Sequence, residues 1–209
     1  VWGDVELCWH VDKASLCGPS RVWLAVTGTN GKTTTVGMTT AICQQAGMSA
    51  VACGTIGYPI EEALLDPNHP DVLVCELSSF QLHWAPSVKP LAGALLNIDE
   101  DHLDWHGSVE AYAADKARVL NGLYAIVGLD DPRAAAAGDE CSAQFVIGFR
   151  AGEPVRGQIG VHENGLFDNA FGPNDAARFL IECADIHPAG PAGVLDAGAA
   201  AALAMAAGA

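Results

Sequence analysis

Basic residues are scarce in this sequence. Ten lysines and arginines stand against 25 aspartates and glutamates, which gives a formal net charge of −15 at pH 7. This balance argues against nucleic acid or an anionic membrane surface as a partner, because both attract a positive protein face. A polyphosphate can still bind such a protein, since backbone N–H groups, a single lysine and metal ions decide that contact locally.

Paired cysteines and long apolar runs are missing as well. The seven cysteines form no C-x-x-C pair and their number is odd, which predicts reduced thiols in a cytoplasmic protein. No stretch approaches the ~20 uninterrupted apolar residues of a membrane span, and none has the pattern of a signal peptide. The sequence starts at Val1 without an initiator methionine and stops at Ala209 within an alanine-rich run. We therefore expect no membrane partner, and we expect the 209 residues to be a fragment.

Apolar residues are plentiful, at half of the composition, which is ample for a buried core. Strand-like runs alternate with helical ones, the pattern of an α/β protein with a mostly parallel sheet flanked by helices. Strands are predicted at 21–26, 49–53, 71–77, 91–98 and 124–129, and helices at 32–46, 108–122 and 193–208. Ser108 is the predicted cap of the helix at 108–122. From 144 to 172, short runs around an Asn164-Gly165 turn predict a small antiparallel β segment at the sheet's edge.

One glycine-rich turn, VTGTNGKTTTVG at residues 26–37, stands between a predicted strand and a predicted helix. Glycines let backbone N–H groups approach an anion and the helix start adds its dipole, so the pattern predicts a phosphate cradle. The lysine would reach the outer phosphates, and the next hydroxyl would join a magnesium ion. The common P-loop needs glycine where this chain has Val26, so an ordinary glycine turn is the alternative. The residues predicted to hold the nucleotide are Gly28, Thr29, Asn30, Gly31, Lys32, Thr33, Thr34 and Thr35.

Two further motifs follow predicted strands, at the carboxyl ends where parallel sheets bind ligands. In CELSSFQLHW, residues 75–84, Glu76 closes the third strand, and in NIDEDHLDWHG, residues 97–107, acidic residues crowd around His102 after the fourth. Helix capping by Asp101 or Asp104 is the structural alternative.

Glu76 and His102 are candidate ligands for a divalent ion beside the phosphates. Magnesium prefers oxygen, so a histidine ligand would be unusual, and manganese would also be tolerated. His102 and His106 stand four residues apart, which on a helix suits a zinc pair, but Gly107 and the neighbouring aspartates favour a loop.

Four stretches taken together resemble the Mur ligase family: TGTNGKTTT, ELSSFQL, LNIDEDHLDWHGS and YAADKARVL. They stand in the family's order and spacing over residues 21–130, and ELSSFQL is similar to the stretch in its D-glutamate-adding branch. The resemblance implies a monomeric, three-domain cytoplasmic ligase of peptidoglycan synthesis. Residues 1–20 would lead out of a UDP-sugar-binding domain and 21–209 would form the central, P-loop-type ATP-binding domain, with a C-terminal amino-acid-binding domain absent.

The implied reaction adds D-glutamate to UDP-N-acetylmuramoyl-L-alanine. ATP would phosphorylate the substrate carboxylate, and the amine would displace phosphate from the acyl phosphate to form an amide. Another Mur ligase or a folylpolyglutamate synthase is an alternative, although SSFQL favours D-glutamate addition. A nucleotide-binding module without activity is a further alternative, but it could dispense with His102 and Lys116, which are both present.

The resemblance also implies roles for individual residues. Lys32 would hold the β- and γ-phosphates, and Thr33 would bind a first magnesium ion. Glu76 and His102 would bind a second ion, which bridges the γ-phosphate and the substrate carboxylate. Lys116 matches a lysine that the family carbamylates, and its carbamate would help to hold that second ion.

Ser78 and Gln81 match positions near the peptide end of the UDP-sugar substrate. Two positions depart from the family pattern. GTIG places Thr55 where the family has an asparagine that contacts substrate, so the amide's reach is lost. AGVLD, residues 192–196, leaves Asp196 to stand in for an asparagine near the adenine.

Overall fold

A single mixed sheet forms the centre of the molecule in the computed structural model, which describes residues 1–172 and 176–209. Within these residues its strands follow the order β2-β3-β1-β4-β5-β6-β7-β8-β9. All neighbours from β2 to β7 are parallel, whereas β7–β8 and β8–β9 are antiparallel. The strands are β1 (Val22–Thr27), β2 (Ala50–Gly54), β3 (Val72–Glu76), β4 (Ala92–Leu95), β5 (Tyr124–Gly128), β6 (Phe145–Arg150), β7 (Gln158–His162), β8 (Gly165–Asp168) and β9 (Arg178–Glu182).

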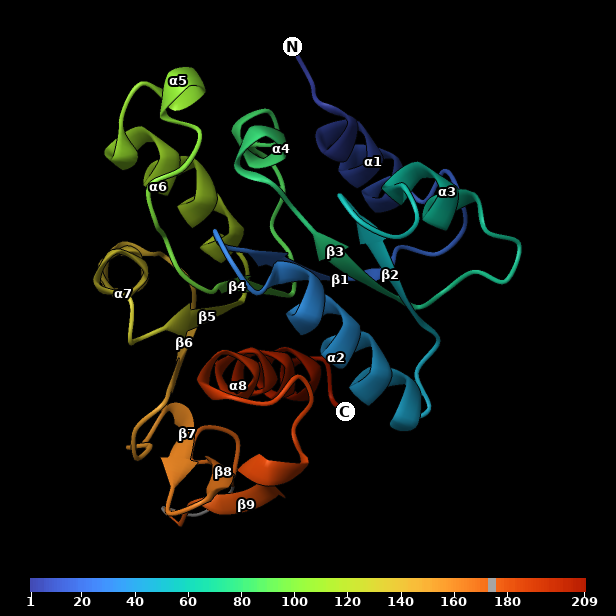
Figure 1. Ribbon diagram of the computed structural model, residues 1–209. Helices are drawn as coiled ribbons and strands as arrows, with labels where there is room; N and C mark the ends of the chain where they lie inside the picture. Colours follow the sequence, from blue (N-terminus) through green and yellow to red (C-terminus); the bar gives the residue numbers. More distant parts are fainter. Residues whose placement is uncertain (173–175) are drawn as a thin grey trace.

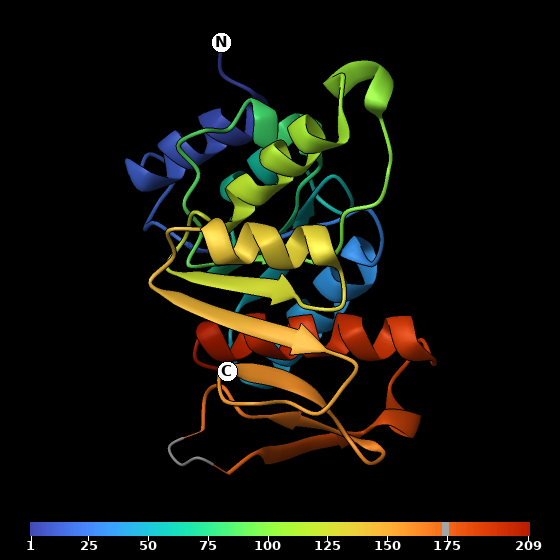
Figure 2. The same cartoon turned by 90° about the vertical axis from the view of Figure 1, so that its left-hand side faces the viewer.

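Helices cover both faces of the parallel part (Figure 1). The helical elements are α1 (Asp4–Lys13), α2 (Lys32–Gln45), α3 (Ile60–Leu65), α4 (Ser79–His83), α5 (Leu103–His106), α6 (Val109–Ala117), η1 (Arg118–Leu120), α7 (Pro132–Glu140), η2 (Cys183–Asp185) and α8 (Pro191–Ala206). Helices α2 and α8 pack on one face, and α1, α3, α4, α6 and α7 pack on the other. Figure 2 shows α7 and α8 on opposite sides of β5 and β6, with β7–β9 beyond α8.

The order in which the chain adds strands to the sheet reverses at β1. From β1 the chain first builds β2 and β3 on one side and then returns to place β4 on the other side. In parallel sheets the crevice at such a reversal, outside the carboxyl ends of the strands, is the usual ligand site. The segments that follow β1, β3 and β4 therefore meet at one edge.

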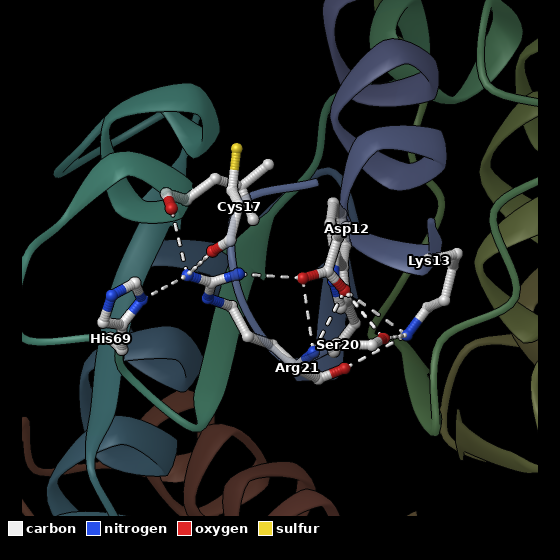
Figure 3. A network of polar contacts seen from close by, with 8 residues as sticks. Asp12, Lys13, Cys17, Ser20, Arg21 and His69 are labelled. Carbon is white, nitrogen blue, oxygen red and sulfur yellow. Dashed lines mark hydrogen bonds and ion pairs between the residues drawn. The ribbon is translucent and has the colours of Figure 1, made fainter. Parts of the chain in front are cut away.

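Helix α1 is tied to the sheet by a buried ion pair, drawn in Figure 3. The Nη1 of Arg21 donates to Asp12 Oδ1 over 3.1 Å, and its Nη2 donates to the carbonyl oxygens of Cys17 and Leu64. Asp12 also accepts from the indole of Trp23. Because Asp12 and Arg21 are both buried, each charge depends on the other and on these hydrogen bonds.

The predicted strands and the long helices at 32–46, 108–122 and 193–208 are confirmed in type, with ends that differ by a few residues. Ser108 accepts a hydrogen bond from Ala111 N at the start of α6, as its predicted capping role requires. No helix among the described residues is long and apolar enough to cross a membrane.

The region from 144 to 172 is only partly antiparallel. The run QFVIGF was expected among antiparallel strands, but β6 pairs in parallel with both β5 and β7. The prediction was wrong because α7, a helix that was not among the predicted elements, carries the chain back across the sheet before β6. The turn between β7 and β8 falls at Glu163-Asn164, one residue earlier than predicted, since His162 pairs with Gly165.

Candidate nucleotide-binding site

The glycine-rich turn runs from the end of β1 into the first turn of α2. Gly28 is buried where an added Cβ would lie 2.9 Å from Leu96 Cβ. Gly31 precedes α2 with a φ of 87°, a left-handed conformation that favours glycine. An added Cβ at Gly31 would also run into the carboxylate of Asp196. Both glycines are therefore required by the geometry of the turn.

Asn97 fixes the conformation of this turn from the end of β4. Its Oδ1 accepts from the backbone N–H groups of Thr29 and Asn30 at 3.1 and 2.9 Å, and its Nδ2 donates to the Asn30 carbonyl. Two of the amides predicted to cradle phosphate are thus occupied by the protein. Asn97 was not predicted as a site residue, because it lay inside the predicted strand 91–98 and had no other signal.

The first turn of α2 offers the N–H groups of Lys32, Thr33 and Thr34 to an anion. Helix N-terminal amides lack partners within the helix and carry its positive dipole, so they form an anion site without further change. Thr35 is completely buried one residue further on, and its amide donates to the Gly31 carbonyl. The ammonium of Lys32 donates to the carbonyl oxygens of Gly28 and Thr29, and so folds over its own loop.

A second lysine reaches the same turn from the far side. Lys116, on α6, is 2% exposed, and its Nζ donates to the Gly28 carbonyl over 2.8 Å. The Nζ also lies 4.7 Å from the centre of the Tyr112 ring. Burial, reinforced by the charge of Lys32 and opposed by Asp101, lowers the pKa of Lys116 to about 7. At neutral pH this amine is therefore partly uncharged.

Glu76 and Thr33 meet at the end of β3. The Thr33 hydroxyl donates to Glu76 Oε2 over 3.0 Å, and the Glu76 residue is 2% exposed. Among the residues that the structure describes, no lysine, arginine or histidine forms an ion pair with this carboxylate. A buried carboxylate with a single hydrogen bond lacks compensation for its charge. Its environment is therefore suited to a bound cation.

Thr55, Ser78 and Gln81 form one small hydrogen-bonded group next to Glu76. Ser78 and Gln81 make a capping box at the start of α4, in which each side chain bonds the other residue's backbone N–H. The Thr55 hydroxyl donates to Gln81 Oε1 over 2.8 Å. Because Oε1 is occupied in this way, Gln81 turns its NH₂ group outward, 3.5 Å from Asp4.

His102 and its acidic neighbours form the exposed rim of this edge. His102 precedes α5 with a φ of 51° and a side chain that is 48% exposed, and its ring lies 4.9 Å from that of Phe80. The expectation of a loop through His106 was wrong, because residues 103–106 form one helical turn. Within the described part of the chain no three histidine, cysteine, aspartate or glutamate side chains gather as a metal site. Among the described residues, Glu76 and His102 therefore do not belong to a group of three side chains of these types that could hold a metal ion.

Asp196 lies on α8 next to Gly31 and at the wall of a cavity of about 220 Å³. Burial raises the pKa of the Asp196 carboxyl to about 6. The cavity adjoins the phosphate turn, as a base or ribose subsite would. Its lining residues are Leu96, Asn97, Gly128, Asp130, Asp131, Phe149, Leu195 and Asp196.

Several known proteins share this fold. A diaminopimelate-adding ligase, UDP-N-acetylmuramoyl-L-alanyl-D-glutamate--2,6-diaminopimelate ligase, superposes with a TM-score of 0.76 at 22% identity, over 96% of this chain and 46% of the other. E. coli FolC in complex with DHPP and ADP superposes at 0.69 and 20% identity, over 100% of this chain and 58% of the other. Similarity at this level of identity shows the fold alone.

Sequence relatives are much closer. UDP-N-acetylmuramoylalanine--D-glutamate ligase of Nocardia farcinica is 59% identical over 203 residues, which are 97% of this chain and 42% of that enzyme. The enzyme of the same name from Mycobacterium tuberculosis is 54% identical over 208 residues, which are 100% of this chain and 41% of that enzyme. The chain thus spans about two-fifths of the length of these curated relatives.

The family model described as "Mur ligase middle domain" matches residues 26–173. This match starts within β1 and takes in the phosphate turn, the end of β3 and helix α6, whereas Asp196 on α8 lies beyond it. The chain therefore belongs to the Mur ligase middle-domain family.

Proposed function

We propose that this chain is the ATP-binding domain of a ligase that adds D-glutamate to UDP-N-acetylmuramoyl-L-alanine in peptidoglycan synthesis. One observation carries the proposal: the first turn of α2, the buried Glu76 and the buried Lys116 all face the same turn at the carboxyl edge of the sheet. The identity to D-glutamate ligases, 52–59% across four of the relatives, favours this member over other Mur ligases. The structure of MurF ligase from Thermotoga maritima, which shares this fold and is in complex with ADP, supports ATP as the nucleotide.

The α2 amides and Lys32 would bind the β- and γ-phosphates, and the cavity beside Asp196 would take the nucleoside. Lys32 is already within 3.1 Å of the Gly28 carbonyl, so it needs only to turn toward the anion. In the reaction, a carboxylate oxygen of the UDP-sugar substrate attacks the γ-phosphorus and ADP leaves. The D-glutamate amine then attacks the acyl carbon, loses a proton and displaces phosphate.

Thr33 fits a first magnesium ion and Glu76 a second, because they offer a hydroxyl and an undercompensated carboxylate, both oxygen donors. The ions would supply neutralisation of charge on the phosphates during transfer. His102 is the remaining candidate ligand, and as a nitrogen donor it fits manganese at least as well.

Lys116 is suited to carbamylation, because an uncharged amine reacts with CO₂ and its pKa is lowered to about 7. A bare ammonium would repel a cation. A carbamate instead carries a negative charge, shared between two oxygens that can bind the cation. We expect ¹³C-bicarbonate to give a carbamate NMR signal in the wild-type protein and none in Lys116→Ala. A full-length Lys116→Ala enzyme with normal activity would contradict the role.

Two neighbouring domains complete the proposal. Residues 1–20 would connect a UDP-sugar-binding domain to residues 21–209, and a further domain would bring the amino acid. The product would then be made by a monomeric cytoplasmic enzyme.

Calorimetric titration with a non-hydrolysable ATP analogue and Mg²⁺ tests the nucleotide site. Lys32→Ala should abolish measurable binding, since the α2 amides alone leave the charge of the γ-phosphate poorly neutralised. Lys89→Ala is the control, because Lys89 is an exposed lysine outside the site. Equal affinity of the Lys32→Ala variant and the wild type would reject the assignment.

Phosphate release tests the reaction. The full-length enzyme should release phosphate only when UDP-N-acetylmuramoyl-L-alanine and D-glutamate are both present. The 209-residue chain, which spans about two-fifths of the length of the D-glutamate ligases that it matches, should release none, because the proposed neighbouring domains would bring acyl phosphate and amine together. Turnover with a different amino acid would favour another Mur ligase, turnover with a folate would favour a folylpolyglutamate synthase, and a complete lack of turnover by the full-length enzyme would favour a module without activity.

A further inference from the structure

Helix α5 is a single turn with little intrinsic stability, and no side chain of the described residues caps its start. It spans four residues, and isolated helices of this length are unstable in water. Both flanking residues, His102 and Gly107, are left-handed, with φ angles of 51° and 80°. For a non-glycine residue such as His102 this conformation is unfavourable and persists only where neighbouring contacts determine it.

The contacts that hold α5 converge on His106. Its side chain is completely buried, although Leu103, Asp104 and Trp105 of the same turn are exposed. The Nε2 atom of His106 lies 3.0 Å from Ser79 Oγ, and its Nδ1 atom lies 3.1 Å from Asp115 Oδ2. His106 therefore joins α5 to both α4 and α6.

The ring of His106 is also enclosed by aromatic side chains. The ring centres of Phe80, Trp105 and Tyr112 lie 5.4, 4.5 and 5.1 Å away. Phe80 is the residue against which His102 packs. The same aromatic group thus supports the buried anchor and the exposed histidine.

The carboxylate of Asp115 also contacts basic side chains other than that of His106. It receives His83 Nδ1 at 2.9 Å and Arg118 Nη2 at 3.1 Å in addition to His106. Asp115 immediately precedes Lys116 on α6, so the carboxylate that holds His106 lies next to the lysine that reaches Gly28.

The Ser79–His106–Asp115 series has the composition of a hydrolytic triad, but its burial excludes that role. Ser79 is 2% exposed and the His106 side chain is not exposed at all, so no substrate carbonyl can reach the serine hydroxyl. The zinc pair suggested by the spacing of His102 and His106 is excluded in the same way, because both ring nitrogens of His106 already have partners.

We propose that His106 is a positioning residue: it anchors α5 to α4 and α6 and thereby presents His102 at the nucleotide edge. This inference rests on the proposed function, in which His102 binds the divalent ion. It assigns His106 no contact with substrate or metal. The His106 ring thus joins α5, which follows His102, to α4, which follows Glu76, and to α6, which carries Lys116.

The test uses His106→Phe in the full-length enzyme, because phenylalanine keeps the ring volume and removes both hydrogen bonds. Asp115 retains His83 and Arg118, so we expect the variant to fold. Amide hydrogen exchange at residues 99–107 should become at least tenfold faster. Mn²⁺ affinity in the presence of the ATP analogue, measured by electron paramagnetic resonance, should fall about tenfold, as for other residues that orient metal ligands.

His83→Phe is the matched control, since His83 also donates to Asp115 but lies on α4 with a side chain 36% exposed. It should leave both measurements within twofold of wild type. His106→Asn, which keeps a donor toward Asp115, should recover part of the exchange protection.

Unchanged exchange at 99–107 in His106→Phe would overturn the anchor, and faster exchange with unchanged Mn²⁺ affinity would overturn the presentation of His102. If the wild type binds no Mn²⁺ with the nucleotide, the proposed function fails, and the exchange comparison alone then decides whether His106 anchors α5.

Discussion

Lys116 should make the stability of this chain depend on pH in a way that one substitution removes. Burial, then the charge of Lys32, lower the pKa of Lys116 from 10.5 to about 7, against an opposing effect of Asp101. At 1.36 kcal/mol per pKa unit, the difference amounts to about 5 kcal/mol of destabilisation below pH 7, where the folded protein must hold a buried ammonium.

The direction of the pH effect follows from where the proton is held. Between pH 7 and about pH 10 the unfolded chain keeps a protonated lysine and the folded chain keeps a neutral one. The unfolded state then binds more protons, so the free energy of unfolding rises with pH. From half-protonation at pH 7, the rise reaches about 1.6 kcal/mol at pH 8.5, and it levels off above the unfolded pKa near 10.5.

Urea unfolding of wild type and Lys116→Met between pH 6.5 and 8.5, in buffers free of CO₂, measures this effect. Methionine has a similar length and no charge. The variant should be the more stable protein at pH 6.5, and its advantage should shrink by about 1.6–2 kcal/mol by pH 8.5. Taking the difference between the two proteins cancels contributions of buried thiols such as Cys8, whose pKa burial raises to about 12.

Lys89→Met provides the reference, because Lys89 is exposed and its substitution should shift stability equally at every pH. If the wild-type and Lys116→Met curves stay parallel within about 0.5 kcal/mol over this range, the buried ammonium does not influence folding and the reasoning is refuted.

Three further substitutions test the framework around the site. Gly31→Ala should weaken binding of the ATP analogue at least tenfold in calorimetry, because alanine disfavours a φ of 87° and its methyl group displaces Asp196. Arg21→Met should lower the free energy of urea unfolding by about 3–5 kcal/mol, since it leaves the buried charge of Asp12 without its partner; a loss below 1 kcal/mol would contradict this. Gly93→Ala should cost about 1–3 kcal/mol in the same assay, because the methyl group meets the backbone of η1.

Much of the fold and part of the site could be predicted from the sequence. Short apolar runs and a glycine turn between strand and helix located the phosphate turn and Glu76, because a strand end and a helix start have local signals. Ser108 was predicted as a cap for the same reason. The parallel pairing of β6 could not be read locally, since parallel and antiparallel strands of similar apolarity look alike over six residues.

Other features of the site depend on contacts between distant segments. An amide such as Asn97 has no pattern that predicts two backbone N–H partners in a loop 67 residues away. A lysine on an amphipathic helix is usually solvated, so only the family resemblance pointed to Lys116, and its 2% exposure is decided by α6 packing over the turn. The anchoring role of His106 likewise exists only once α4, α5 and α6 are assembled.

The packing of α8 against α2 has a consequence for how the protein is made. Val36 and Cys43 of α2 share one core cluster with Ala199, Ala202 and Leu203 of α8, yet residues 46–190 lie between the two helices. Helix α2 covers β1, β2 and β3 on this face, but β4 and β5 leave the ribosome before α8, the helix that covers them, and such bare apolar surface favours aggregation. Asp196 reaches Gly31 only after residues 46–190 have been made. The α2 amides are therefore in place in the nascent chain before the contact between Asp196 and the phosphate turn can form.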